Sequence, residues 1–137
     1  GRTQVNPLAF LAVGAGATLG AWFRWWLGLC LNTVFPNLPP GTLAANLIGG
    51  YVIGAALGAI NYEMALPVTA RLFLMTGFCG GLTTFSTFSA ETFALFSRGQ
   101  IAWGLGAIAI HVGGSLLATT LGVFTIGLFR HIAGGAS

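Results

Sequence analysis

Four long apolar runs, joined by short segments rich in proline, glycine or polar residues, are the feature that most constrains this fold. They cover approximately residues 7–31, 42–62, 68–96 and 101–132. A helix that crosses a bilayer needs about 20 consecutive apolar residues, so each run is long enough to span a membrane. Only 5% of the residues are charged, against about 25% in an ordinary soluble domain. We therefore predict one transmembrane domain over residues 1–137, with no separate soluble domain.

The connections between the runs favour helices joined in hairpins. Pro36, Pro39 and Pro40 interrupt any helix in the first connection, and Thr42 is a candidate N-cap for the second helix. Within lipid only helices and closed barrels satisfy their backbone hydrogen bonds, and the alternating pattern of barrel strands is absent. The sequence thus predicts an all-α membrane protein with four transmembrane helices. The first run is too long for a cleaved signal, so we expect it to remain as a span.

The few ionisable residues exclude several classes of function. Five arginines stand against Glu63 and Glu91, and lysine and aspartate are absent. The chain therefore lacks the basic stripe that binds nucleic acid and the paired titratable groups of most hydrolytic enzymes. The two cysteines and the two histidines are widely separated in the sequence, which predicts neither a disulfide nor a cluster of metal-ligating side chains.

Small and polar residues recur at every fourth position in three of the runs, which places them on one face of each helix. The stripes are Gly16, Gly20, Arg24 and Gly28; Thr42, Asn46, Gly50, Gly54 and Gly58; and His111, Ser115 and Thr119. Small residues let helix backbones approach closely, so the glycines predict packing seams. Asn46 is the strongest polar candidate for function, because an amide inside a span is costly and usually functional.

Arg24 admits two interpretations. It lies near one end of its run, among Trp22, Trp25 and Trp26, where an arginine can extend to the headgroups within a belt of aromatic residues. Alternatively, its charge lines a water-filled vestibule that attracts anions. Glu91 sits near the outer end of the third run, where we expect it to reach headgroup water.

The third run contains a segment that is a poor helix. Residues 77–89 read GFCGGLTTFSTFS, in which three glycines precede threonine, serine and phenylalanine. Glycines weaken a helix, and an interrupted helix inside a membrane is tolerated where it is buried in protein or lines a polar path. After the glycines, Phe85 and Phe88 share one helical face, with hydroxyl side chains around them. We therefore predict a helix break and a functional site in this segment.

The run GGLTTFSTFS at residues 80–89 strongly resembles the signature of the Fluc (CrcB) family of small bacterial fluoride channels. The four spans, the arginine late in the first span and the run GTLxxNLxG at residues 41–49 agree with this family. The resemblance covers nearly the whole chain. It implies a dual-topology, antiparallel homodimer in the bacterial inner membrane, with the third helix broken at mid-membrane. It also implies passive export of fluoride through two pores, and thus a channel and not an enzyme.

The resemblance also assigns site residues. It implies that Phe85 and Phe88 line the pores with their rings and that Asn46 stands beside the permeating ion. Backbone carbonyls of Gly80 and Thr83 from both subunits are implied to hold a structural sodium ion at the dimer centre. Aromatic rings have a positive edge, so an anion can pass beside these rings without meeting a full cation that would bind it too tightly.

Hydroxyl groups are expected to extend this site. Fluoride holds its water tightly, so a pore must replace that water with hydrogen-bond donors, which amides and hydroxyls supply. We therefore expect Thr84, Thr87 and Ser115 to contribute hydroxyls to the pore. In the same reading, Arg24 lies in the vestibule.

Three other classes of membrane protein share some of these features. A small multidrug-type proton-coupled transporter also has four spans, but it needs a carboxylate deep in the membrane, and the first span here has none. His111 and Ser115 lie one turn apart, as in an intramembrane serine protease, but no nucleophile elbow accompanies them. A purely structural membrane subunit stays open from composition alone.

Overall fold

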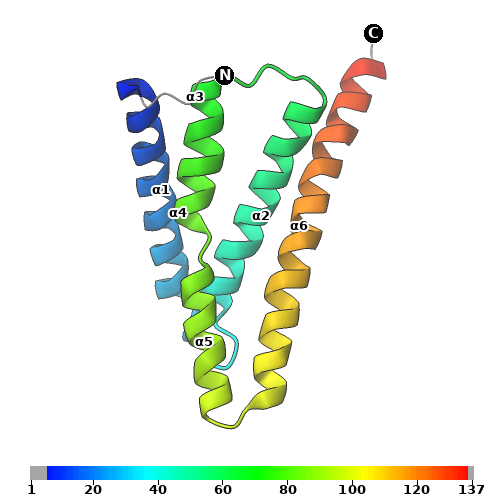
Figure 1. Cartoon of the computed structure of the whole chain (residues 1–137). Helices are drawn as coiled ribbons and strands as arrows, with labels where there is room; N and C mark the ends of the chain where they lie inside the picture. Colours follow the sequence, from blue (N-terminus) through cyan, green and yellow to red (C-terminus); the bar gives the residue numbers. More distant parts are fainter. Residues whose placement is uncertain (1–5, 136–137) are drawn as a thin grey trace.

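The computed structural model describes residues 6–135, which contain helices and no strand (Figure 1). The elements are α1 (Pro7–Leu31), α2 (Pro40–Asn61), α3 (Val68–Arg71), η1 (Leu72–Cys79), α4 (Gly80–Leu82), α5 (Phe85–Ser97) and α6 (Ile101–Gly135), of which η1 is a π-helix. Four stretches are long and apolar enough to cross a membrane: Pro7–Leu31, Pro40–Asn61, Val68–Ser97 and Ile101–Gly135. The predicted all-α architecture with four membrane-capable helices is confirmed.

Prolines and a short polar side chain set where the first two helices begin. Pro7 opens α1 directly after Asn6, whose side chain accepts a hydrogen bond from an N–H of the first turn at 2.7 Å. Pro40 opens α2, because proline is tolerated in the first turn, where its missing N–H is not needed. The prediction that Thr42 is an N-cap was therefore wrong. Thr42 lies inside α2, and its hydroxyl donates to Glu91 instead.

The helices pack in two close pairs, α1 with η1 and α2 with α6. A Cβ atom on Gly16 or Gly20 would collide with the backbone of the third span, and one on Gly54 would collide with the backbone of α6 at Thr119. The glycines of the two stripes thus form packing seams in which backbones touch directly, as is usual between helices in lipid. Figure 1 shows α2 running beside α6, with α1 and the upper part of the third span on the other side.

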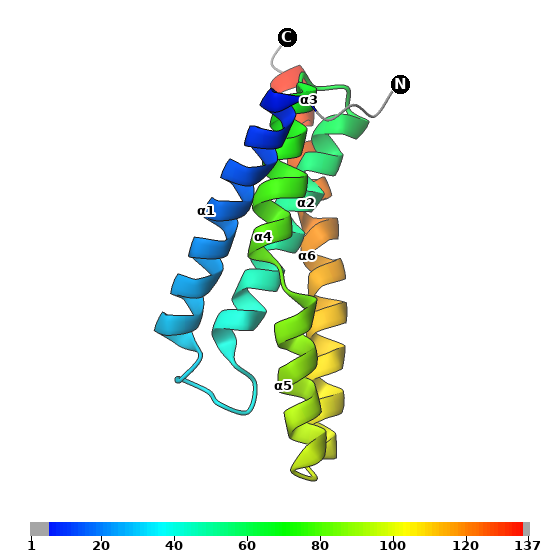
Figure 2. The same ribbon diagram turned by 60° about the vertical axis from the view of Figure 1, so that its left-hand side comes forward.

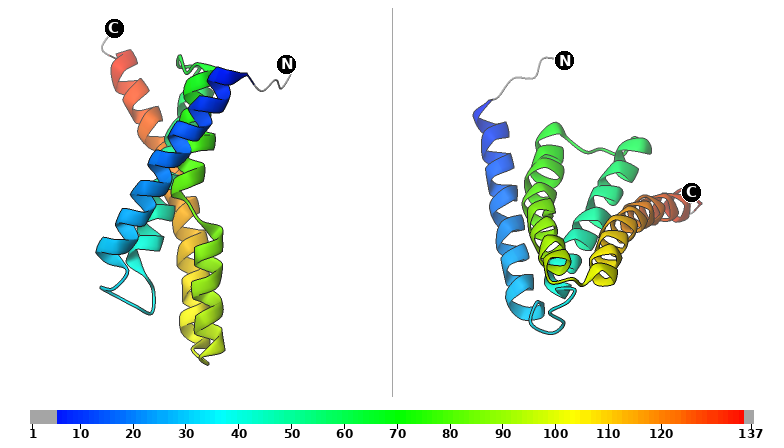
Figure 3. Two further views of the ribbon diagram at one scale, coloured as in Figure 1. Left: turned by 90° about the vertical axis from the view of Figure 1, so that its left-hand side faces the viewer. Right: turned by 60° about the horizontal axis from the view of Figure 1, so that its bottom comes forward.

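The third span changes its packing partner part-way along. Elements η1 and α4 pack against α1, whereas α5 packs against α6 (Figures 2 and 3). Thr83 (φ −78°, ψ 152°) and Thr84 (φ −147°, ψ 115°) form an extended link between α4 and α5. The Thr84 hydroxyl oxygen then caps α5 by accepting a hydrogen bond from the Thr87 N–H at 3.1 Å. The link lets one span contribute to both helix pairs.

Candidate functional site

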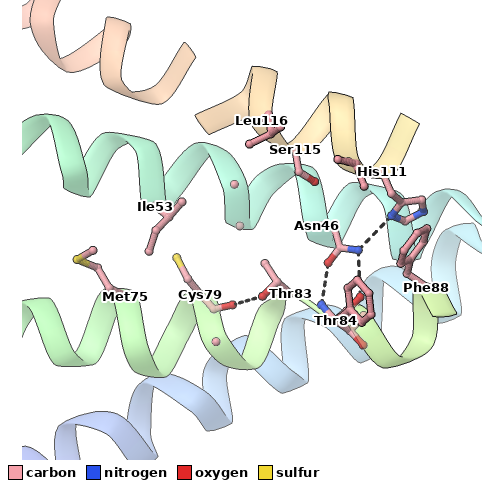
Figure 4. Close-up of a pocket in the computed structure, with 15 residues that line it drawn as sticks. Asn46, Ile53, Met75, Cys79, Thr83, Thr84, Phe88, His111, Ser115 and Leu116 are labelled. Atoms are coloured by element: carbon pink, nitrogen blue, oxygen red, sulfur yellow. Dashed lines mark hydrogen bonds between the residues drawn. The ribbon is translucent and has the colours of Figure 1, made fainter. Parts of the chain in front are cut away.

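A pocket of about 520 Å³, which we call the central pocket, lies beside the extended link between α4 and α5 (Figure 4). Its walls come from α2, the third span and α6. The predicted site residues that line it are Asn46, Gly80, Thr83, Thr84, Phe85, Phe88 and Ser115. His111, which the sequence placed in a packing stripe, lines it as well. Side chains that are far apart in the sequence therefore converge on one cavity.

Asn46 pairs with the main chain of Thr84 as a neighbouring β-strand would. The Thr84 N–H donates to Asn46 Oδ1 at 2.7 Å, and Asn46 Nδ2 donates to the Thr84 carbonyl at 3.1 Å. Thr84 lies between α4 and α5, and its N–H bonds to Asn46 instead of to a carbonyl one turn earlier. The asparagine amide supplies both partners, which matters because an unpaired backbone group in lipid costs several kcal/mol.

His111 completes the contacts of the Asn46 amide. Asn46 Nδ2 lies 3.1 Å from His111 Nδ1, and because an amide nitrogen only donates, the ring nitrogen accepts. The neutral imidazole therefore carries its proton on Nε2. His111 is 4% exposed, and the centroid of its ring lies 4.6 Å from that of Phe88. Both N–H groups of Asn46 are thus engaged, one by Thr84 and one by His111.

Phe85 and Phe88 form an edge-on pair in which the two rings differ in exposure. Their centroids lie 5.5 Å apart, with an angle of 67° between the ring planes. Phe88 is 8% exposed because it packs against His111, whereas Phe85 is 77% exposed. The Phe85 ring therefore lies open on the wall of the central pocket.

Three hydroxyl groups cluster at the start of α5. The Thr84 hydroxyl donates to Thr87 Oγ1 at 3.1 Å and lies 3.3 Å from Ser86 Oγ. This cluster surrounds the N-terminus of α5, where the first N–H groups and the helix dipole favour negative charge. Ser115 lies apart from the cluster, on the α6 wall of the central pocket.

A second pocket, of about 320 Å³, borders Arg24 and is called here the Arg24 pocket. Arg24 is half-buried, and its Nε donates to the Gly81 carbonyl at 3.0 Å. Thr84 and Thr87 line this pocket, so Thr84 borders both cavities. Arg24 thus contacts the third span and borders a cavity, and its role in a vestibule stays a prediction.

Glu91 lies closer to the site than its place near the end of the third run indicated. The Thr42 hydroxyl donates to Glu91 Oε2 at 2.6 Å. Thr42 is 4% exposed and Glu91 is half-buried, and Thr42 also lines the Arg24 pocket. The sequence feature that could have indicated this contact is the i, i+4 stripe of polar and small residues on α2, in which Thr42 precedes Asn46 by one turn. Both residues of this polar face bond to the third span.

The link leaves two carbonyl oxygens without a hydrogen-bond donor from the described residues. In a continuous α-helix the Thr84 N–H would bond to the Gly80 carbonyl, but here it bonds to Asn46. Within residues 6–135, no hydrogen bond reaches the carbonyl of Gly80 or of Thr83. Gly80 also faces open space, since a Cβ atom there would meet nothing within 4 Å. The same range holds no group of three or more His, Cys, Asp or Glu side chains placed to bind a metal.

We predict that replacing His111 with phenylalanine loosens the extended link. The variant keeps an aromatic ring beside Phe88 but leaves an N–H of Asn46 without its acceptor, at a cost of about 1–3 kcal/mol. Hydrogen exchange at the Thr84 amide, measured on the protein in detergent, should therefore become faster. The His131→Phe variant is the control and should not change it. Unchanged exchange in His111→Phe would show that His111 does not hold Asn46.

Known proteins resemble this chain over most of its length. The sequence model of the family described as CrcB-like protein, Camphor Resistance (CrcB), matches residues 11–123. A fluoride-specific ion channel FluC from Nitrosospira multiformis is 60% identical over 118 residues, which cover 86% of this chain and 92% of the relative. FluC from Dechloromonas aromatica is 52% identical over 127 residues, covering 93% and 94%. The family match contains every residue that lines the central and Arg24 pockets. The chain belongs to the CrcB-like protein family.

Proposed function

We propose that this chain forms a fluoride-selective channel, which exports fluoride by passive conduction across the bacterial inner membrane. The observation that carries this proposal is its identity of 60% to a protein named as a fluoride-specific ion channel, over 92% of that relative. With four membrane-capable helices and channel relatives, the chain is a multi-pass membrane protein and not an enzyme.

The geometry of the two pockets supports conduction of a small anion. Ring edges of Phe85 and Phe88 present partial positive charge, and the N-terminus of α5 adds the positive end of a helix dipole. The described residues that line the two pockets include no carboxylate. Because Thr84 borders both cavities, we place the anion path from the Arg24 pocket past Thr84 into the central pocket. Thr87 lines the first part of this path and Ser115 the second.

Asn46 has a structural task on this path. Its two N–H groups already contact the Thr84 carbonyl and His111 Nδ1, so an ion that contacts the amide must displace one of these acceptors. We propose that Asn46 lies beside the ion and holds the link extended. In that conformation Phe85 lines the central pocket and Thr84 lines both cavities.

We predict that replacing Phe85 or Phe88 with isoleucine abolishes or sharply reduces fluoride flux. The side chain stays apolar and changes little in volume, so a loss would point to the electrostatics of the ring. Fluoride efflux from liposomes that contain only this protein measures the effect. Asn46→Leu should also stop flux, because it removes both the amide and the partners of Thr84.

The matched control for these variants is Phe93→Ile. Phe93 lies on the same helix and is 73% exposed, but it lines neither pocket. Each variant must elute from gel filtration like the native protein. Native flux in both the Phe85 and Phe88 variants would remove the rings from the path, and an absence of fluoride flux from the native protein would refute the channel.

We also propose that two copies assemble as an antiparallel homodimer with two pores. In the single chain, Phe85 is 77% exposed and Gly80 faces open space, although both line the central pocket. A second copy seated on this face would cover them. Such a two-fold interface uses the same surface of each chain, so every contact would occur twice.

The arginines give little preference for either orientation in the membrane. Arg71 and Arg130 lie toward the end of the bundle where α1 begins and α6 ends, and Arg24 and Arg98 lie toward the other (Figure 1). Arg2, which the sequence adds to the first group, lies outside the described residues. The difference in positive charge between the two ends is therefore almost zero. Under the positive-inside rule, such a balance favours insertion in both orientations.

We predict that each end of the protein is accessible from both sides of the membrane. Single cysteines at Gly135 or Ser97, in a chain without Cys30 and Cys79, would be labelled in intact bacterial cells with a maleimide that cannot cross membranes. About half of the chains should react from outside at either position, because opposite orientations are equally favoured. The remainder should react only after permeabilisation. Labelling of one position from one side only would refute dual topology.

A sodium ion at the dimer centre fits the unpaired carbonyls. We propose that Gly80 and Thr83 of each chain hold it with their main-chain oxygens, which would make four ligands from the two copies. Hard, neutral oxygens without a nearby carboxylate suit a monovalent hard cation better than zinc or calcium. The positive charge would offset repulsion between anions in the two flanking pores.

We predict that assembly depends on sodium. Purification with N-methylglucamine in place of sodium should weaken the dimer and lower fluoride flux, because the carbonyls of Gly80 and Thr83 then lose the cation that they are proposed to coordinate. Gly80→Ala should have a similar effect by crowding the dimer centre. Gly106→Ala is its control, since a Cβ atom at either glycine meets nothing within the chain. A dimer of native strength without sodium would rule out the ion's structural role.

A further inference from the structure

A third pocket lies away from the channel site, where the end of α2 meets the last turns of α6. It has a volume of about 460 Å³ and is called here the Arg130 pocket. Its lining residues are Tyr62, Gly127, Arg130, His131, Gly134 and Gly135. Figure 1 shows the two helix ends at the same end of the bundle. The family match stops at residue 123, so the α6 wall of this pocket lies beyond the segment that defines the family.

Arg130 is held over Tyr62 in this pocket. Its Nη1 donates to the Tyr62 carbonyl, and its guanidinium carbon lies 5.3 Å from the centroid of the Tyr62 ring. The ring itself packs on Gly127, where a Cβ atom would lie 2.8 Å from the Tyr62 hydroxyl oxygen. Among the described residues, no carboxylate forms an ion pair with Arg130. The structure thus positions a guanidinium that no carboxylate within residues 6–135 neutralises.

The length of α6 places this guanidinium near the lipid headgroups. The helix has 35 residues, or about 50 Å at 1.5 Å per residue, whereas the hydrocarbon core is only about 30 Å thick. Arg130 lies in the last two turns, beside the connection that follows α2. Its neighbours Leu128, Phe129 and Ile132 are 59%, 60% and 63% exposed. A charged pocket therefore adjoins an apolar surface at the membrane boundary.

We propose that the Arg130 pocket binds the phosphate of an anionic phospholipid. The guanidinium N–H groups that do not contact Tyr62 can donate to two phosphate oxygens, and the His131 ring offers a further N–H. The exposed apolar residues beside the pocket would contact the acyl chains, which distinguishes a lipid from free phosphate. The helix dipole places about half a negative charge at the C-terminus of α6, which repels an anion. This partial charge is smaller than the full positive charge of Arg130.

Native mass spectrometry of the full chain, released from detergent with added phosphatidylglycerol, tests this proposal. The native protein should retain phosphatidylglycerol, and Arg130→Gln should retain about fivefold less, the effect of one interfacial cation on an anionic lipid. Arg130→Lys should restore most of the retention, because it keeps the charge. Arg71→Gln is the matched control. Arg71 lies at the same end of the bundle and also donates to a carbonyl, but it lines no part of the pocket.

Three outcomes would overturn the proposal. An equal loss in Arg71→Gln would show general attraction to the surface and not a site. Equal retention of diacylglycerol, which lacks the phosphate, would show that only the acyl chains bind. Displacement of phosphatidylglycerol by inorganic phosphate alone would assign the pocket to the free ion. Both glutamine variants remove an exposed charge, and an unchanged charge-state distribution would show that each remains folded.

Discussion

The pairing of one side-chain amide with one main-chain residue supports the whole central part of this structure. Thr84 lies between two helices, and Asn46 supplies a hydrogen-bond partner to its N–H and to its carbonyl. In water, solvent could do the same. Inside a bilayer it cannot, so an interrupted span requires another span to provide these bonds. The link therefore persists only while α2 packs beside it in the register that places Asn46 next to Thr84.

This requirement explains why the remaining helices pack as they do. Glycines in α2 allow its backbone to touch α6. Helix α6 also carries His111, whose Nδ1 accepts a hydrogen bond from the Asn46 amide. Meanwhile α1 holds the part of the third span before the link. The link joins these two pairs, and the third span passes from α1 before the link to α6 after it (Figure 3). The extended link thus connects the two helix pairs, and both the central pocket and the Arg24 pocket border Thr84.

Sequence patterns predicted the elements of this fold better than the contacts between them. Apolar runs and prolines give the four spans, and the i, i+4 glycines mark the seams, because both depend on local periodicity. The bond between Asn46 and His111 joins residues 65 positions apart, and no periodicity reveals such a partner. Thr42 shows the same limit. Its place near a helix start suggested a cap, but its partner Glu91 comes from another span.

The π-helical segment Leu72–Cys79 has a consequence for how this span can vary among related sequences. A π-helix closes each turn with an i→i+5 bond and so contains one residue more than the α-helix it replaces, and such turns are frequent at functional sites. Such a turn can absorb a single-residue deletion by tightening to an α-helix. Because the π-turn holds the extra residue, this change would leave Gly81, which follows the segment, on the face that the α1 backbone adjoins. A single-residue deletion here would therefore preserve both the helix and its register, whereas the same deletion in an α-helical part of the span would turn the residues beyond it by about 100°.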